Sequence, residues 1–120
     1  MADPRHQLGA RAEEATAAWL TRSGWRVLAR RWRSSFGELD LVCLDPSGAL
    51  VGVEVKLRRT SRAGRAVEAI DGRRLGRLRR SLAAYAREQC SASVVRLDLV
   101  SVEPTPGGWH LARVAGIDAW

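Results

Sequence analysis

A chain of 120 residues, of which 46% are hydrophobic, can form one domain around a single core and is too short for two. No apolar run reaches the ~18 residues of a membrane-spanning helix, and no apolar segment follows the charged N-terminus as in a secretory signal. Cys43 and Cys90 are too few and too far apart for a disulfide framework or a zinc site. The sequence therefore predicts a cytoplasmic protein without a membrane partner, with a flexible tail at residues 1–6 and a single domain at residues 7–120.

The net charge of +7 is concentrated in one segment of the chain. Nineteen arginines and one lysine, Lys56, carry the positive charge, and ten of the arginines lie in residues 58–87 against two acids. Guanidinium groups pair well with phosphates, and counterion release favours association with a polyanion. The segment indicates a nucleic-acid partner, although a solvated helix face would have the same composition.

The first half of the chain predicts one helix and three strands. Residues 7–23 are expected to form a helix that Gly24 ends. Apolar residues recur in it at helical spacing and form one stripe: Leu8, Ala12, Ala15 and Trp19. Three strands are expected to follow, the last two joined as a hairpin by a turn at residues 45–48: residues 25–32, 38–44 and 50–58.

The second half of the chain predicts a helix and two strands. A basic loop at residues 60–65 leads to a long helix that is capped near Asp71. The buried stripe of that helix is expected to consist of Leu75, Leu78, Leu82 and Tyr85. Strands are expected at residues 94–102 and 109–114. This order predicts an α/β fold with an αβββαβ core, in which a mixed central sheet is flanked by helices.

Two acids are expected on the neighbouring strands of the hairpin. Glu54 and Lys56 alternate with Val55 in one strand and therefore point to the same face, and Asp40 lies in the preceding strand. Mg²⁺ prefers a few carboxylates and keeps several waters. Asp40 and Glu54 could therefore hold Mg²⁺ or Mn²⁺, and the backbone carbonyl of Val55 could add a ligand.

Lys56 is expected to orient an attacking water and to offset charge that develops on a phosphate. A planar guanidinium cannot replace a compact ammonium there, which fits the use of lysine at this position alone. Glu13, at the edge of the first helix's stripe, is a further candidate ligand, direct or through water, and Glu38 is a weaker one. The alternative is an ion pair between Glu54 and Lys56 on a solvated sheet face, which would contribute little.

Other residues are candidates for contact with nucleic acid. Trp32 lies among arginines and could stack on an unpaired base, but an aromatic side chain covering the end of the sheet is favoured. The arginines expected to bind nucleic acid lie after the third strand, in the basic loop and at the start of the second helix: Arg58, Arg62, Arg65, Arg73, Arg74 and Arg77.

Five short motifs together resemble the YraN family of bacterial proteins: Gly9-x-x-x-Glu13, Gly37-Glu38-Leu39-Asp40-Leu41-Val42, Val53-Glu54-Val55-Lys56-x-Arg58, Glu68-Ala69-Ile70 and Arg96-x-Asp98-x-Val100. That family is similar to the restriction-endonuclease-like nucleases, the PD-(D/E)xK superfamily, and to archaeal Holliday junction resolvases. The resemblance covers residues 8–103 and implies an active-site core of Asp40, Glu54 and Lys56. It also implies that Glu13 matches the first-helix acid of the resolvases. The chain departs from the pattern in three places: no proline precedes Asp40, Gly52 stands where the family usually has a bulky residue, and Arg73 and Arg74 stand where a lysine is expected.

These observations predict a Mg²⁺-dependent endonuclease that acts on DNA in repair, recombination or processing. Structure-selective cleavage is expected because the chain has no separate domain for reading bases. A non-catalytic nucleic-acid-binding protein on a degenerate nuclease fold stays open, as does an RNA-directed nuclease or an interaction subunit. The sequence also leaves open a homodimer.

Overall fold

A computed structural model of the chain describes residues 4–58, 70–89 and 94–118, with the side chains described from residue 7 onward. Most of the basic loop expected at residues 60–65, including Arg62 and Arg65, lies outside the described residues. The described elements follow one another in the order α1 (Pro4–Arg22), β1 (Arg26–Ser34), β2 (Gly37–Leu44), β3 (Leu50–Leu57), α3 (Gly72–Gln89), β4 (Val95–Thr105) and β5 (Gly108–Val114). This αβββαββ order confirms the predicted α/β fold.

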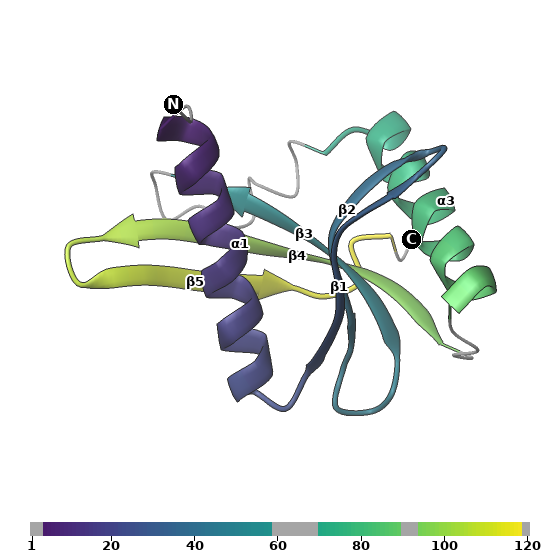
Figure 1. The fold of residues 1–120 in the computed structure, drawn as a ribbon, viewed down its shortest axis with the longest axis horizontal. Helices are drawn as coiled ribbons and strands as arrows, with labels where there is room; N and C mark the ends of the chain where they lie inside the picture. Colours follow the sequence, from purple (N-terminus) through teal and green to yellow (C-terminus); the bar gives the residue numbers. More distant parts are fainter. Residues whose placement is uncertain (1–3, 59–69, 90–93, 119–120) are drawn as a thin grey trace.

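The described strands form one mixed sheet in the spatial order β1-β2-β3-β4-β5 (Figure 1). Neighbouring strands are antiparallel except for β3 and β4, which are parallel. Parallel strands need a crossover connection, and the segment containing α3 provides it. None of the helices in the described ranges is both long and apolar enough to cross a membrane.

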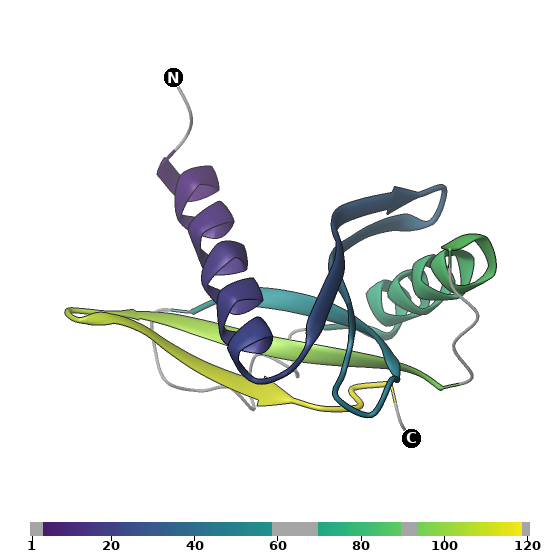
Figure 2. The same cartoon turned by 60° about the horizontal axis from the view of Figure 1, so that its bottom comes forward.

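The two described helices pack on opposite faces of the sheet. Successive residues of a strand point to alternate faces, so a single strand contributes side chains to the core under each helix. On β3, Val51 and Val53 belong to the core cluster that includes residues of α1, whereas Leu50 belongs to the cluster that includes residues of α3. The β1–β2 hairpin bends away from the rest of the sheet (Figure 2). A register shift in β1 between Val27 and Ala29 contributes to this bend.

Helix α1 begins at Pro4, so residues 4–6, which were expected in a flexible tail, are helical. Its buried stripe is rotated from the predicted one: Thr16 and Leu20 are buried, whereas Ala15 is only partly buried. A buried threonine is tolerated here because its hydroxyl donates a hydrogen bond to the carbonyl of Ala12 at 2.8 Å. Glu13 lies one turn before Thr16 on the same side of α1. The rotation therefore turns Glu13 toward the sheet, where it contacts Arg31 of β1.

Helix α3 follows the prediction closely. The amide of Arg74 donates to Oδ1 of Asp71 at 2.8 Å, so Asp71 is the N-cap. The predicted stripe is buried: Leu75, Leu78, Leu82 and Tyr85.

Strand β4 is longer than the predicted 94–102 and continues to Thr105 through Pro104. Among the described residues, β4 has no strand partner on the β3 side beyond Val102, because the pairing of β3 with β4 ends at Leu57 and Val102. A proline without an N–H is tolerated at such an unpaired edge. The turn to β5 is therefore later than expected.

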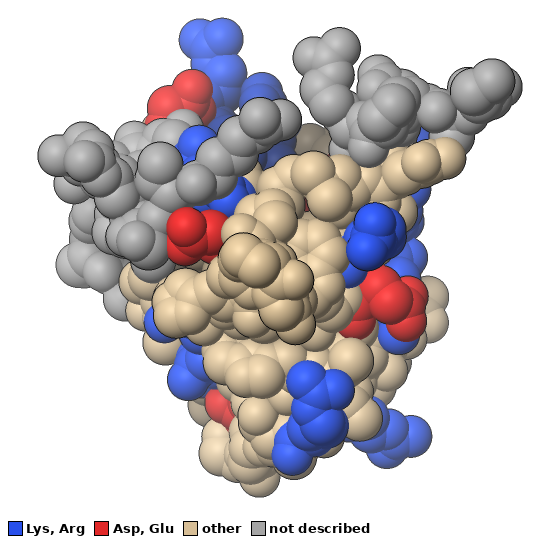
Figure 3. Space-filling view, turned by 90° about the vertical axis from the view of Figure 1, so that its left-hand side faces the viewer, with Lys and Arg blue, Asp and Glu red and all other residues tan. Residues whose placement is uncertain are grey.

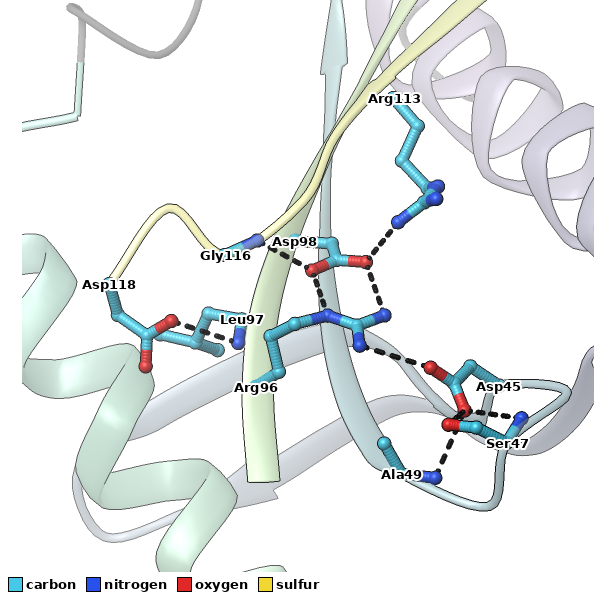
Figure 4. A network of polar contacts seen from close by, with 9 residues as sticks. All are labelled: Asp45, Ser47, Ala49, Arg96, Leu97, Asp98, Arg113, Gly116 and Asp118. Carbon is cyan, nitrogen blue, oxygen red and sulfur yellow. Dashed lines mark hydrogen bonds and ion pairs between the residues drawn. The ribbon is translucent and has the colours of Figure 1, made fainter. Parts of the chain in front are cut away.

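A buried acid, Asp98, ties β4 to β5 at the far end of the sheet (Figure 4). Its side chain is fully buried and accepts hydrogen bonds from Nε and Nη2 of Arg96 at 2.7 and 3.0 Å. It also accepts from Nη1 of Arg113 at 2.8 Å and from the amide of Gly116 at 2.9 Å. Removing one of these hydrogen-bond partners would leave the buried charge of Asp98 uncompensated, which is strongly unfavourable. The carboxylate therefore holds its partners in one geometry.

The same network reaches the turn between β2 and β3 through Asp45. Nη1 of Arg96 donates to Oδ2 of Asp45 at 3.0 Å, and Oδ1 of Asp45 accepts from the amides of Ser47 and Ala49 at 2.9 and 3.0 Å. Burial opposes ionisation of Asp45, but the hydrogen bonds from Ser47, Ala49 and Arg96 outweigh it and lower the pKa to about 2. The ionised carboxylate is therefore the form that holds the turn.

We expect Asp45→Asn to lower the free energy of unfolding by about 1–2 kcal/mol at neutral pH, because hydrogen bonds to the ionised form are lost. The pKa of Asp45 is lower in the folded state, so its contribution is present above pH ~4 and is lost as pH falls toward 2. Urea unfolding of the parent and the variant from pH 7 to pH 2.5 measures this difference. The difference should shrink at acid pH, and a constant difference would contradict the assignment. Glu14→Gln, at an exposed acid paired with Arg30, is the control and should change little.

Candidate active site

Asp40 lies where β2 separates from β3. The last paired residues of the two strands are Leu41 and Val53, and beyond them the β1–β2 hairpin bends away (Figure 2). The amide of Val55, which a continued β2 would have paired, donates instead to Oδ2 of Asp40 at 2.8 Å. The side chain of Asp40 thus replaces a strand carbonyl, and the break in the ladder holds its carboxyl group in place.

Glu54 lies against Asp40 in a nearly closed position. Its side chain is 2% exposed. Burial, followed by hydrogen bonding to Glu54 and by the charge of Glu54, raises the pKa of Asp40 to about 8. The structure thus brings together the two acids that the sequence placed on neighbouring strands.

Arg74 neutralises Glu54 from the first turn of α3. Its Nε donates to Oε2 of Glu54 at 2.8 Å, and its Nη2 donates to the same oxygen. The sequence analysis placed Arg74 among the nucleic-acid contacts, whereas in the structure its guanidinium is bound to an acid of the site. The arginine side chain is 41% exposed, so one side of it still faces solvent.

Arg31 was missed by the sequence analysis. It has a φ of 47°, a left-handed conformation that no other non-glycine residue in the described ranges adopts. This conformation costs an L-residue on the order of 1 kcal/mol. The neighbours of Arg31 in β1, Arg30 and Trp32, pair with Leu41 and Leu39 on either side of Asp40. Nε of Arg31 donates to Oε1 of Glu13 at 3.0 Å. Strand alternation carries no signal for a single left-handed residue among charged and aromatic neighbours such as Arg30, Trp32 and Arg33.

Glu13 lies close to the two acids but is not grouped with them. Its carboxylate is bound to Arg31, and its charge adds to the rise in the pKa of Asp40. No three His, Cys, Asp or Glu side chains are grouped to hold a metal in the part of the chain that the structure describes. Asp40 and Glu54 nevertheless fit a hard divalent cation as a pair, because Mg²⁺ takes one or two carboxylates and fills its other positions with water.

The remaining predicted site residues lie around this pair. Lys56 is half-buried and lies two residues after Glu54 on β3, opposite Ser101 of β4. The amide of Val55 donates to Asp40. The group of Val55 that was expected as a metal ligand is its carbonyl. Glu38, the weaker candidate ligand, forms a cross-strand ion pair with Arg33 at 3.0 Å. Its carboxylate thus has a structural partner.

The arginines after β3 are spread over several positions. Arg73 and Arg77 are exposed on α3, and Arg77 lines a small cavity of about 30 Å³ together with Arg74 and Glu38. Arg58 is half-buried at the end of β3, and its Nε is buried without a hydrogen-bond partner among the described residues. On the side of the molecule shown in Figure 3, the basic side chains stand at the margin around a largely uncharged centre. They therefore form no continuous basic patch on the described part of this face.

Trp32 packs into the fold. Its ring lies edge-on to Tyr85 with centroids 5.2 Å apart, and it borders the core cluster on the α3 side. The interpretation as an aromatic that covers the end of the sheet is favoured over base stacking by this contact.

Comparison with known proteins identifies relatives along most of the chain. The family described as "Uncharacterised protein family UPF0102" matches residues 12–102. A UPF0102 protein of Corynebacterium efficiens is 38% identical over 98% of this chain and 97% of its own. A UPF0102 protein of Mycolicibacterium gilvum is 43% identical over 96% of both chains.

Two solved structures resemble this fold in part. A repair endonuclease from Pyrococcus abyssi aligns with a TM-score of 0.46 and 20% identity over 89% of this chain, which spans 41% of that protein. SfsA from Pyrococcus furiosus, in complex with Ca²⁺, aligns with a TM-score of 0.34 and 14% identity over 94% of this chain and 63% of its own.

The left-handed conformation of Arg31 predicts an unusual order of stability. Arg31→Gly and Arg31→Ala both lose the ion pair with Glu13, but glycine adopts a positive φ without strain. We expect the glycine variant to be the more stable by about 0.5–1 kcal/mol in urea unfolding. Arg30 is the matched control, because it pairs with Glu14 and has no positive φ. Glycine should be the less stable variant there, and the same order at both positions would contradict the prediction.

Proposed function

We propose that Asp40, Glu54 and Lys56 form the active site of a metal-dependent nuclease in this chain, which belongs to the uncharacterised protein family UPF0102. The observation that carries the proposal is the contact between Asp40 and the buried Glu54 at the point where β2 leaves β3. Two acids held together at the cost of desolvation and repulsion are typical of functional sites.

Asp40 and Glu54 would hold a divalent cation, Mg²⁺ or Mn²⁺, through their carboxylate oxygens. Val55, through its carbonyl, and Glu13, directly or through water, are further candidate ligands. A cation bound there would supply Lewis-acid activation of water and would offset charge on a phosphodiester. The Val55 amide would keep Asp40 oriented toward Glu54 throughout.

Lys56 would act on the same reaction from the adjacent position of β3. It shares the face of Glu54, because the two residues are separated by one position in a strand. Its ammonium would orient the attacking water and stabilise charge that develops on the phosphate. The Glu54-x-Lys56 pattern and its resemblance to PD-(D/E)xK nucleases support this assignment.

DNA is the substrate that we favour, in repair, recombination or processing in the cytoplasm. Arg58, Arg73 and Arg77 would contact the phosphate backbone, as would Arg62 and Arg65, which lie outside the described residues. Such contacts bind without reading bases, so they would select a DNA structure rather than a sequence.

A second candidate function is non-catalytic binding of nucleic acid. The ion pair between Arg74 and Glu54 favours it, because Arg74 engages the oxygen that a metal would need. A requirement for a divalent cation in cleavage separates the two functions.

Asp40→Asn and Glu54→Gln are expected to abolish Mg²⁺-dependent cleavage while nucleic-acid binding is retained or tightened. Each variant removes a ligand charge and also removes repulsion toward phosphate. The measurement is a cleavage panel of duplex, single-stranded, flap and four-way DNA and of RNA, with Mg²⁺, Mn²⁺ or a chelator. Glu38→Gln is the matched control, since its acid pairs with Arg33 and should be dispensable. Cleavage by both site variants at the parent rate would show that this site is not the active site.

Lys56→Arg is expected to preserve the fold and most of the binding but to lower the rate of cleavage by about 10²–10³. The charge is kept, but a longer planar group cannot take the place of the ammonium beside the attacking water. Single-turnover kinetics at saturating substrate isolates the chemical step. Arg77→Gln, at an exposed arginine, should weaken binding and reduce its salt dependence without changing that rate. An unchanged rate for Lys56→Arg would favour the non-catalytic function.

A further inference from the structure

Arg74 occupies one of the two carboxylate oxygens through which Glu54 could bind a metal ion. Both described hydrogen bonds from the Arg74 guanidinium, from Nε and from Nη2, end on Oε2. A carboxylate oxygen offers about two lone pairs, so these bonds leave that oxygen without a free pair for a cation. A metal that binds through Oε2 therefore has to displace Arg74 at least in part.

The position of Arg74 is unfavourable for its own helix. It lies in the first turn of α3, which contains no acidic residue, and a cation at a helix N-terminus opposes the helix dipole. The contact with Glu54 compensates for this, because Glu54 is 2% exposed and its charge needs a partner. The Arg74 guanidinium thus supplies the positive charge beside Glu54 that a metal ion would otherwise supply.

Arg74 can also reach solvent from this position. Its side chain is 41% exposed, and it lines a cavity of about 30 Å³ with the exposed Arg77. A guanidinium released from Glu54 would remain at the N-terminus of α3, beside Arg73 and Arg77. That surface attracts phosphate, because guanidinium groups donate hydrogen bonds to it.

We propose that Arg74 exchanges between Glu54 in the metal-free protein and a nucleic-acid phosphate in the metal-bound protein. The inference rests on the proposed metal site at Asp40 and Glu54. It makes one side chain the link between two ligands: a cation that takes Glu54 frees Arg74 for phosphate, and phosphate that takes Arg74 frees Glu54 for the cation. Such coupling is reciprocal, so each ligand raises the affinity for the other by the same factor.

The first experiment measures DNA binding at constant ionic strength by fluorescence anisotropy of a labelled duplex, in Ca²⁺ and in chelator, with a gel to show that the DNA stays intact. Ca²⁺ serves as the probe because it also prefers oxygen ligands. Arg74→Gln should weaken binding by about tenfold in Ca²⁺, within the range of about 5–150-fold that is typical of coupled sites. It should change binding little in chelator, where Arg74 is held by Glu54 in the parent. Arg73→Gln, at the exposed neighbour, is the matched control and should weaken binding equally in both conditions.

The second experiment measures Mn²⁺ binding to the protein without DNA by calorimetry. Arg74→Gln should bind Mn²⁺ more tightly than the parent, because the competing guanidinium is gone. Arg74→Lys keeps a charge beside the buried acid and guards against misfolding, and it should retain a dependence of DNA binding on Ca²⁺. Thermal melts confirm that each variant is folded.

The two proposals fail in different ways. If the parent binds no Mn²⁺, or binds it as well after Glu54→Gln, the metal site is wrong and the exchange is wrong with it. If the parent binds Mn²⁺ through Glu54 but Arg74→Gln weakens DNA binding equally in Ca²⁺ and in chelator, Arg74 is an ordinary phosphate contact and only the exchange is overturned. An Arg74→Gln variant with unchanged DNA and Mn²⁺ affinities overturns the exchange as well.

Discussion

The hydrogen bond from the Val55 amide to Asp40 is the constraint on which the candidate site depends. A strand that leaves its neighbour exposes amides that need new acceptors, because a buried unpaired N–H is costly. Asp40 supplies the acceptor from its side chain and is thereby held against Glu54. The separation of β2 from β3 therefore both opens the sheet and places the two acids against each other.

Charge balance around the two acids comes from elements on both faces of the sheet. Arg74 reaches Glu54 from α3, while Arg31 of β1 pairs with Glu13 of α1. Each pair joins residues 18 or 20 positions apart in the chain. The acids are thus surrounded by guanidinium groups that limit repulsion in the metal-free protein.

The other end of the sheet contrasts with the site because its charges are fully satisfied. Asp98 accepts from Arg96, Arg113 and Gly116, and Arg96 continues to Asp45. The contacts from Arg113 and Gly116 join β5 and the segment after it to β4, and the contact with Asp45 joins the turn between β2 and β3 to β4. None of them leaves an acid paired with another acid. Rigidity at this end supports β3 and β4 in the register that positions Glu54 and Lys56.

The sequence by itself determined the order of the elements, the buried stripe of α3 and the shared face of Glu54 and Lys56, because these follow from local periodicity. It also indicated Asp40 and Glu54, since the turn at residues 45–48 sets a hairpin register in which the two acids lie near each other. Only the tertiary structure decided the rotation of α1, the left-handed Arg31 and the pairing of Arg74 with Glu54. Those features depend on how distant elements pack and on which charges meet across them, and spacing along a single chain carries no information about such contacts.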